Sequence, residues 1–119
     1  MTFVRNCVGL AALAAGLLVG VGAQAADAQK GKHFFNEVYG CFQCHGTVGQ
    51  GSAVTSNGKI LTRTQMPYEA FALFVRTTNR TMPPYREQVL PNSDLQDIYA
   101  YLQSIPASPD YKSIPILND

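Results

Sequence analysis

One five-residue stretch, Cys-Phe-Gln-Cys-His at positions 41–45, constrains this chain more than any other. It places two thiols, Cys41 and Cys44, and the imidazole of His45 within a single turn of chain. The third cysteine, Cys7, lies in an apolar stretch near the start, where it serves as a small apolar residue. The fold must therefore form around two thiols with a histidine directly behind them.

Residues 1–25 have the order of a secretory signal peptide. Arg5 supplies the positive charge, residues 7–23 are uncharged, and residues 23–25 (Ala-Gln-Ala) form a small-x-small cleavage triplet. We expect cleavage after this triplet, within two residues, which leaves residues 26–119 as one exported, periplasmic domain. An uncleaved anchor is the alternative, because the apolar run is at the lower limit of length for a membrane span.

The charge balance excludes two classes of partner. The whole chain carries 9 Lys and Arg against 8 Asp and Glu, and loss of Arg5 brings the side-chain charge close to zero. Nucleic-acid binding demands a basic surface, and anionic lipid attracts a polybasic stretch, neither of which is present. We therefore expect no nucleic-acid partner, and no stable membrane insertion once the signal peptide is cleaved.

The chain after the signal peptide has helical patterns and no strand pattern. Apolar residues recur at helical spacing over about residues 28–38, over 67–77 and in a third segment that stops at Pro106. Two long loops, residues 46–59 and 79–92, separate these segments. Long loops in so small a domain are uncommon unless they wrap something. The sequence thus predicts an all-α domain whose loops enclose a bound group.

Finer features of the three segments give further expectations. Gly31 lies inside the first, where it indicates close packing against another backbone, and the second is apolar over a wide arc, which predicts burial. The third begins with a predicted capping box, Ser93 to Gln96. Apolar sides are expected in the first segment (Phe34, Phe35, Val38) and in the third (Leu95, Ile98, Tyr99, Leu102, Ile105).

The pattern C-x-x-C-H is typical of covalent haem attachment in c-type proteins. The thiols of Cys41 and Cys44 would add across the two vinyl groups of haem to give thioethers. His45 would reach the iron from one face as the proximal ligand. We further expect a carbonyl of the loop 46–59 to accept the Nδ1–H of His45 and fix its tautomer.

Three other kinds of site could contain two such thiols. A thioredoxin-like site needs a strand before the pattern and a helix after it, whereas here a helix precedes and a glycine-rich loop follows. A structural zinc ion needs four ligands, and only His33 could complete the set, at a spacing that matches no usual zinc module. A simple disulfide would leave His45 without a role.

The distal iron ligand has three candidates, Met66, Met82 and His33. Met82 is favoured because it lies in Thr-Met-Pro-Pro-Tyr, residues 81–85, where the prolines stiffen the loop that presents the sulfur. Met66, just before a helix, reads as core filling, and His33 reads as a surface residue. Ligation by His and Met raises the reduction potential and fills both axial positions, which leaves no place for a substrate.

The stretches YGCFQCHG, FVRTTNRTMPPY and SDLQDIYAYLQSIP resemble the class I (mitochondrial-type) monohaem cytochrome c family of bacteria, over residues 31–106. The resemblance implies the cytochrome c fold, with three to four helices and long loops wrapped around one covalent haem. It implies a close crossing of the first and last helices, where Gly31 and Phe35 would meet Tyr99 or Leu102. One departure is that Phe35 lies six residues before Cys41, farther than is usual in the family.

These observations predict a periplasmic electron carrier with one haem c, and not an enzyme. Its partners would be redox proteins, with a dehydrogenase as donor and an oxidase or another cytochrome as acceptor. Phe42 and the uncharged loop 46–56 are candidates for the docking surface. The alternatives are a haem subunit of a periplasm-facing dehydrogenase complex, a five-coordinate gas-binding sensor and a thiol oxidoreductase.

Two groups of residues have open roles at this stage. The glycines of the loop after the haem motif match no nucleotide-binding pattern, and we expect them to let the backbone lie close to the haem edge (Gly46, Gly49, Gly51). Three arginines are either partners of the haem propionates or ordinary surface residues (Arg63, Arg76, Arg80).

Overall fold

The computed structural model describes residues 25–52, 58–107, 109 and 111–117. Within these ranges the chain forms helices, turns and loops without a strand, which confirms the all-α class. None of the helices in these ranges has the length and apolar character that a membrane crossing requires. The predicted signal peptide lies outside the described residues, apart from its last position.

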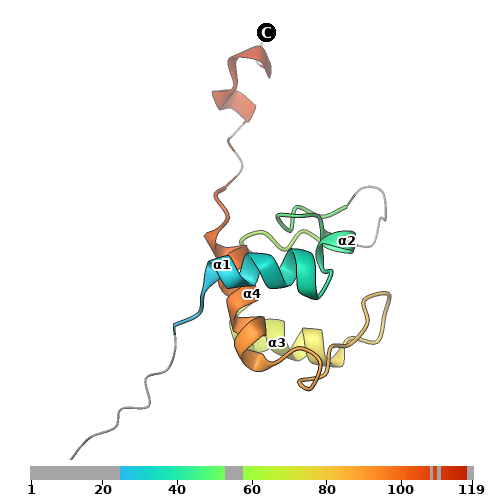
Figure 1. The fold of residues 1–119 in the computed structure, drawn as a ribbon. Coiled ribbons are helices and arrows are strands. Elements are labelled where there is room, and N and C mark those ends of the chain that lie inside the picture. Colours follow the sequence, from blue (N-terminus) through green and yellow to red (C-terminus); the bar gives the residue numbers. More distant parts are fainter. Residues whose placement is uncertain (1–24, 53–57, 108, 110, 118–119) are drawn as a thin grey trace, which may run out of the picture.

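Within the described ranges, four α-helices and three short helices of other types follow one another. The elements are α1 (Ala28–His33), η1 (Phe34–Val38), α2 (Phe42–His45), α3 (Tyr68–Thr77), α4 (Asn92–Ser104), η2 (Tyr111–Ser113) and η3 (Pro115–Leu117). Helix α1 lies across α4, while α2 and the loop after α3 extend to the same side of this pair (Figure 1). The described residues of the tail, 107, 109 and 111–117, run away from the helices (Figure 1).

The first helix begins at a side-chain cap. The carboxylate of Asp27 accepts hydrogen bonds from the backbone N–H of Gln29 at 2.9 Å and of Lys30 at 3.2 Å, which satisfies two free donors of the first turn. The backbone N–H of Asp27 donates to the Asp97 carboxylate at 2.7 Å. The start of α1 is therefore attached to the middle of α4.

The helix then widens into the π-helical segment η1. Its ladder includes the bond from the Tyr39 N–H to the Phe34 carbonyl, at 2.9 Å, and such a turn holds one residue more than an α-helical turn. The wider turn takes up part of the extra length between Phe35 and Cys41. It also turns Val38 outward, with 52% of its surface exposed, so the predicted placement of Val38 on the apolar side was wrong.

The crossing of α1 and α4 is closest at Gly31. A Cβ atom built there would lie 1.9 Å from the backbone carbonyl oxygen of Asp97, so only glycine fits. The predicted close contact is confirmed, but its partner on α4 is the backbone of Asp97 and Ile98.

One helical turn further on, Phe35 is 1% exposed and its ring packs against that of Tyr101, with ring centroids 5.8 Å apart. Leu102 is fully buried in the same core. Tyr99, the other expected partner, instead packs against α3, where it meets the rings of Tyr68 and Phe71. The assignment of Tyr99 to the crossing was therefore wrong.

Helix α4 starts without the predicted capping box. Pro91 occupies the N-cap position and no side chain caps the helix. Because the helix begins at Asn92, Ser93 already lies in its first turn, and its hydroxyl donates to the Asp94 carboxylate at 3.0 Å. The buried stripe contains Leu95, Ile98 and Leu102 as expected, with Tyr101 in place of Tyr99.

Helix α3 is buried on one side only. Phe71 and Val75 belong to the core, whereas 64% of Leu73 and 50% of Phe74 are exposed. The expectation that the whole apolar arc is buried was therefore wrong. Pro67 precedes the helix as its N-cap residue.

Replacing Gly31 with alanine should destabilise the fold. Alanine gains about 1 kcal/mol in helix propensity over glycine, but here its methyl group would collide with backbone, and overpacking typically costs about 1–3 kcal/mol. We expect the collision to dominate and the free energy of unfolding in urea to fall. Lys32→Ala, on the exposed side of the same helix, is the control and should change stability by less than about 0.5 kcal/mol. A Gly31→Ala variant as stable as this control would contradict the close crossing.

Candidate haem site

A cavity of about 510 Å³ lies between the helices and the two long loops. Its volume falls in the range of pockets that hold small molecules and cofactors. One wall is formed by apolar residues of α3 and α4 (Phe71, Phe74, Val75, Leu95, Ile98). The loop 79–92 adds Leu90, and Leu61 comes from the segment before α3. The expectation that long loops enclose a space is confirmed for the loop 79–92, whereas Lys59 is the one described residue of the loop 46–59 that lines the cavity.

The Cys-x-x-Cys-His stretch borders this cavity. Cys41 stands just before the short helix α2, which contains Cys44 and His45. The His45 N–H donates to the Cys41 carbonyl at 3.0 Å, so one helical turn connects the first cysteine to the histidine. All three residues line the cavity, as a covalently attached haem would require.

The imidazole of His45 has a defined tautomer. Its Nδ1 lies 2.8 Å from the backbone carbonyl oxygen of Lys59. Because a carbonyl oxygen only accepts hydrogen bonds, Nδ1 carries the proton and Nε2 keeps its lone pair. Lys59 ends the loop 46–59, so the expectation that this loop supplies the acceptor is confirmed. Such a bond orients a metal-ligating histidine and raises its basicity.

The same loop also contacts the backbone of the Cys-x-x-Cys-His stretch. The N–H of Gly51 donates to the His45 carbonyl at 2.8 Å, and a Cβ atom on Gly58 would lie 1.5 Å from the carbonyl oxygen of Cys44. Gly49 is buried and its carbonyl accepts from Leu61 and Thr62. The loop glycines 46, 49 and 51 are not among the cavity-lining residues, so their expected place at the haem edge was wrong.

Two methionines also line the cavity. Met82 is half-buried and packs against the core, whereas Met66 is 39% exposed. The backbone carbonyl of Met66 accepts the Tyr99 hydroxyl at 2.8 Å. His33 is not among the lining residues, and its Nδ1 lies 3.2 Å from the Glu37 carboxylate. The structure thus brings both methionines, but not His33, to the cavity that contains the thiols.

The charged residues at the cavity differ from those expected. Of the three candidate arginines, Arg80 lines the cavity, together with Lys59, which the sequence did not single out as a cation. Arg76 instead donates to the Tyr85 carbonyl at 2.7 Å and to the Asn92 side chain at 2.8 Å. Arg63 lies in a turn outside the cavity lining.

Tyr39 connects the approach to the haem motif with α4. Its hydroxyl donates to the Asp94 carboxylate at 2.6 Å. Burial and then this hydrogen bond raise the pKa of Tyr39 to about 12, so the phenol stays protonated near neutral pH. Sequence reasoning missed this residue, because the spacing of one tyrosine and one aspartate far apart in the chain gives no signal.

The environment of the Cys41 thiol does not favour a role as the nucleophile of a thiol oxidoreductase. Both Cys41 and Cys44 are free. Burial raises the pKa of the Cys41 thiol to about 11, so it remains protonated near neutral pH, whereas thiol–disulfide exchange depends on the thiolate. Nor does the described part of the chain bring together three or more residues that could hold a metal ion through His, Cys, Asp or Glu.

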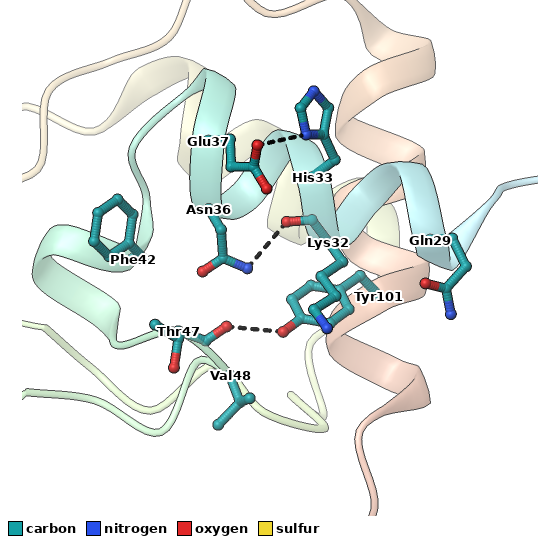
Figure 2. Close-up of a pocket in the computed structure, with 9 residues that line it drawn as sticks. All are labelled: Gln29, Lys32, His33, Asn36, Glu37, Phe42, Thr47, Val48 and Tyr101. Carbon is teal, nitrogen blue, oxygen red and sulfur yellow. Dashed lines mark hydrogen bonds and ion pairs between the residues drawn. The ribbon is translucent and has the colours of Figure 1, made fainter.

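A second hollow, of about 480 Å³, is bordered by residues of α1 and η1 (Figure 2). Its lining mixes charged, polar and apolar residues (Gln29, Lys32, His33, Asn36, Glu37, Phe42, Thr47, Val48, Tyr101). Figure 2 shows the bonds from Asn36 to the Lys32 carbonyl and from Tyr101 to the Thr47 carbonyl. Neither cysteine nor His45 lines this hollow, so it is not the haem site.

Comparison with known proteins gave a match to a protein family. A model of the family described as "Cytochrome C oxidase, cbb3-type, subunit III" matches residues 26–102. No curated protein and no solved structure matched the chain. The matched region contains the haem motif, both candidate methionines and nearly all of α4. Because the match spans well over half of the 119 residues, the chain belongs to this family of c-type cytochromes.

Proposed function

We propose that this protein is a periplasmic electron carrier with one haem c, attached through Cys41 and Cys44 and ligated by His45 and Met82. Family membership supports haem-based electron transfer in general. The observation that carries the finer proposal is that one cavity gathers all four of these side chains. The largely apolar lining and the free lone pair on His45 Nε2 fit the group as well.

Each residue has a separate task in this proposal. The two thioethers fix the porphyrin in the cavity, and His45 supplies a nitrogen ligand whose orientation the Lys59 carbonyl holds. Met82 supplies a thioether, a soft ligand that raises the reduction potential. The bound haem would supply a one-electron iron couple. The apolar walls keep water from the iron, and Arg80 and Lys59 are the cations placed to neutralise the propionates.

Both axial positions would be filled by side chains, so no site remains for a substrate at the iron. The protein therefore acts as a carrier and not as an enzyme. Its redox partners would dock weakly, through a small interface that permits fast release. Phe42, placed between the two cysteines and 36% exposed, is the residue we assign to that surface.

A fixed haem subunit of a periplasm-facing complex is the second candidate. The family description names an oxidase subunit, while the sequence suggested a dehydrogenase complex. Affinity purification of the protein from whole cells solubilised in mild detergent separates the two functions. A free carrier elutes alone, whereas a subunit elutes with its complex in fixed proportion.

Covalent attachment is the first prediction to test. The mature protein, exported in a host that matures c-type haem, should gain the mass of one haem in denaturing mass spectrometry. Cys41→Ser and Cys44→Ser should each retain a single thioether or lose the haem, and Ser104→Ala, far from the cavity lining, should behave as the wild type. A mature chain that carries no haem would refute the proposal, and two haems would refute the monohaem assignment.

Alanine variants of Met82 and Met66 form a matched pair that tests which methionine is the distal ligand. Met82→Ala should abolish the sulfur–iron charge-transfer band, lower the reduction potential and open the iron to carbon monoxide. Met66→Ala should change none of these, because we assign Met66 no bond to the iron. The reverse pattern would make Met66 the ligand, and a wild type that binds carbon monoxide would favour the five-coordinate sensor.

A further inference from the structure

The loop that carries Met82 is fixed at its two ends and not along its length. At one end, the Thr78 N–H donates to the Phe74 carbonyl at 2.9 Å, and Thr78 is buried. At the other end, the Tyr85 N–H donates to the Val75 carbonyl at 3.0 Å. Within the described part of the chain, residues 79–84 make no recorded hydrogen bond. The position of Met82 therefore depends on the two anchors and on the packing of its side chain against the core.

The anchor at Tyr85 makes more hydrogen bonds than the anchor at Thr78. Besides its N–H bond to α3, its carbonyl accepts from Arg76 Nη1 at 2.7 Å. Its hydroxyl donates to the Tyr39 carbonyl at 3.3 Å, two residues before Cys41. Tyr85 thus connects the loop that carries Met82 to α3 and to the segment just before the haem motif.

Arg76 makes this anchor rigid. The planar guanidinium holds two different oxygens at once, the Tyr85 carbonyl through Nη1 and the Asn92 side chain through Nη2, at 2.7 and 2.8 Å. Asn92 in turn donates to the Glu87 carboxylate at 2.7 Å. One fork therefore joins the end of α3, the Met82 loop and the start of α4, a geometry that the single ammonium of lysine does not reproduce.

The link between this anchor and the sulfur is short and stiff. Only Pro83 and Pro84 separate Met82 from Tyr85. Each proline fixes its own φ and restricts the residue before it, so a shift of Tyr85 is transmitted to Met82 instead of being absorbed. We propose that Arg76 and Tyr85 are positioning residues that hold Met82 over the cavity, and that Arg76 therefore acts on the distal ligand and not on a propionate.

The proposal rests on Met82 as the iron ligand, and it predicts a partly opened distal side. Arg76→Gln and Arg76→Lys remove the fork, and a hydrogen bond from a charged group is worth about 1.5–3 kcal/mol. That range corresponds to roughly a 10- to 100-fold rise in the fraction of molecules with Met82 displaced. Tyr85→Phe keeps the ring and the backbone bonds but loses the hydroxyl, so its effect should be smaller and in the same direction.

The test uses the haem-loaded mature protein well below its unfolding temperature. We expect the Arg76 variants to bind carbon monoxide about 10-fold faster or more, and to lose the sulfur–iron band on heating before far-UV circular dichroism reports unfolding. Arg86→Lys, an exposed arginine on the same loop, is the control and should match the wild type in both.

Two outcomes separate this inference from the proposed function. If the wild type shows the sulfur–iron band, and the Arg76 variants only lower the unfolding temperature with unchanged carbon monoxide kinetics, the positioning role is wrong while Met82 remains the ligand. If the wild type lacks the band, or Met82→Ala keeps it, the ligation itself is wrong and the inference fails with it.

Discussion

The close contact of backbones at Gly31 is the constraint on which the rest of the domain depends. Because α1 meets α4 at Gly31 with no side chain between them, η1, which continues α1, is also held against α4. The haem motif follows directly, so the positions of Cys41 and His45 derive from that crossing. The hydrogen bonds of Asp27 to Asp97 and of Tyr39 to Asp94 flank it on both sides, and together they fix α1 and η1 along α4.

Most of the side chains that form the core of this small domain also line the cavity. Eight apolar side chains form the buried cluster of the described residues, and six of them also line the cavity (Phe35, Phe71, Val75, Leu90, Leu95, Ile98). A small chain buries a modest share of its surface. A bound porphyrin would therefore complete the core, because its faces would cover the side chains that now border the cavity. Phe74, half exposed on α3, lines the same space and would be covered with them.

The parts of the structure that sequence predicted are those with a local physical cause. The helical periodicity of α3 and α4 and the thiol–imidazole motif depend on neighbours within a few residues, and Gly31 could be recognised because glycine is unfavourable inside a helix, although its contact partner on α4 could not. The errors concern choices made by tertiary contacts. A π turn moved Val38 outward, Pro91 as the N-cap placed the start of α4 before Ser93, and Tyr99 packs against α3 instead of at the crossing. The role of Arg76 was equally invisible, because its acceptors are a backbone carbonyl and an amide that no pattern predicts.

The two sides of the cavity are built by different means. On one side, the proposed ligand His45 lies inside a helical turn, its ring bonded to the Lys59 carbonyl and its own carbonyl to the Gly51 N–H. On the other, the proposed ligand Met82 lies on a loop whose middle, residues 79–84, makes no hydrogen bond and which two prolines stiffen. Any displacement of a ligand should therefore begin on the methionine side, where the free energy that resists opening resides in a few contacts at the ends of the loop. In such a carrier, residues that never touch the iron can change the distal side and, through it, the reduction potential. The covalent attachment and the histidine then remain unchanged.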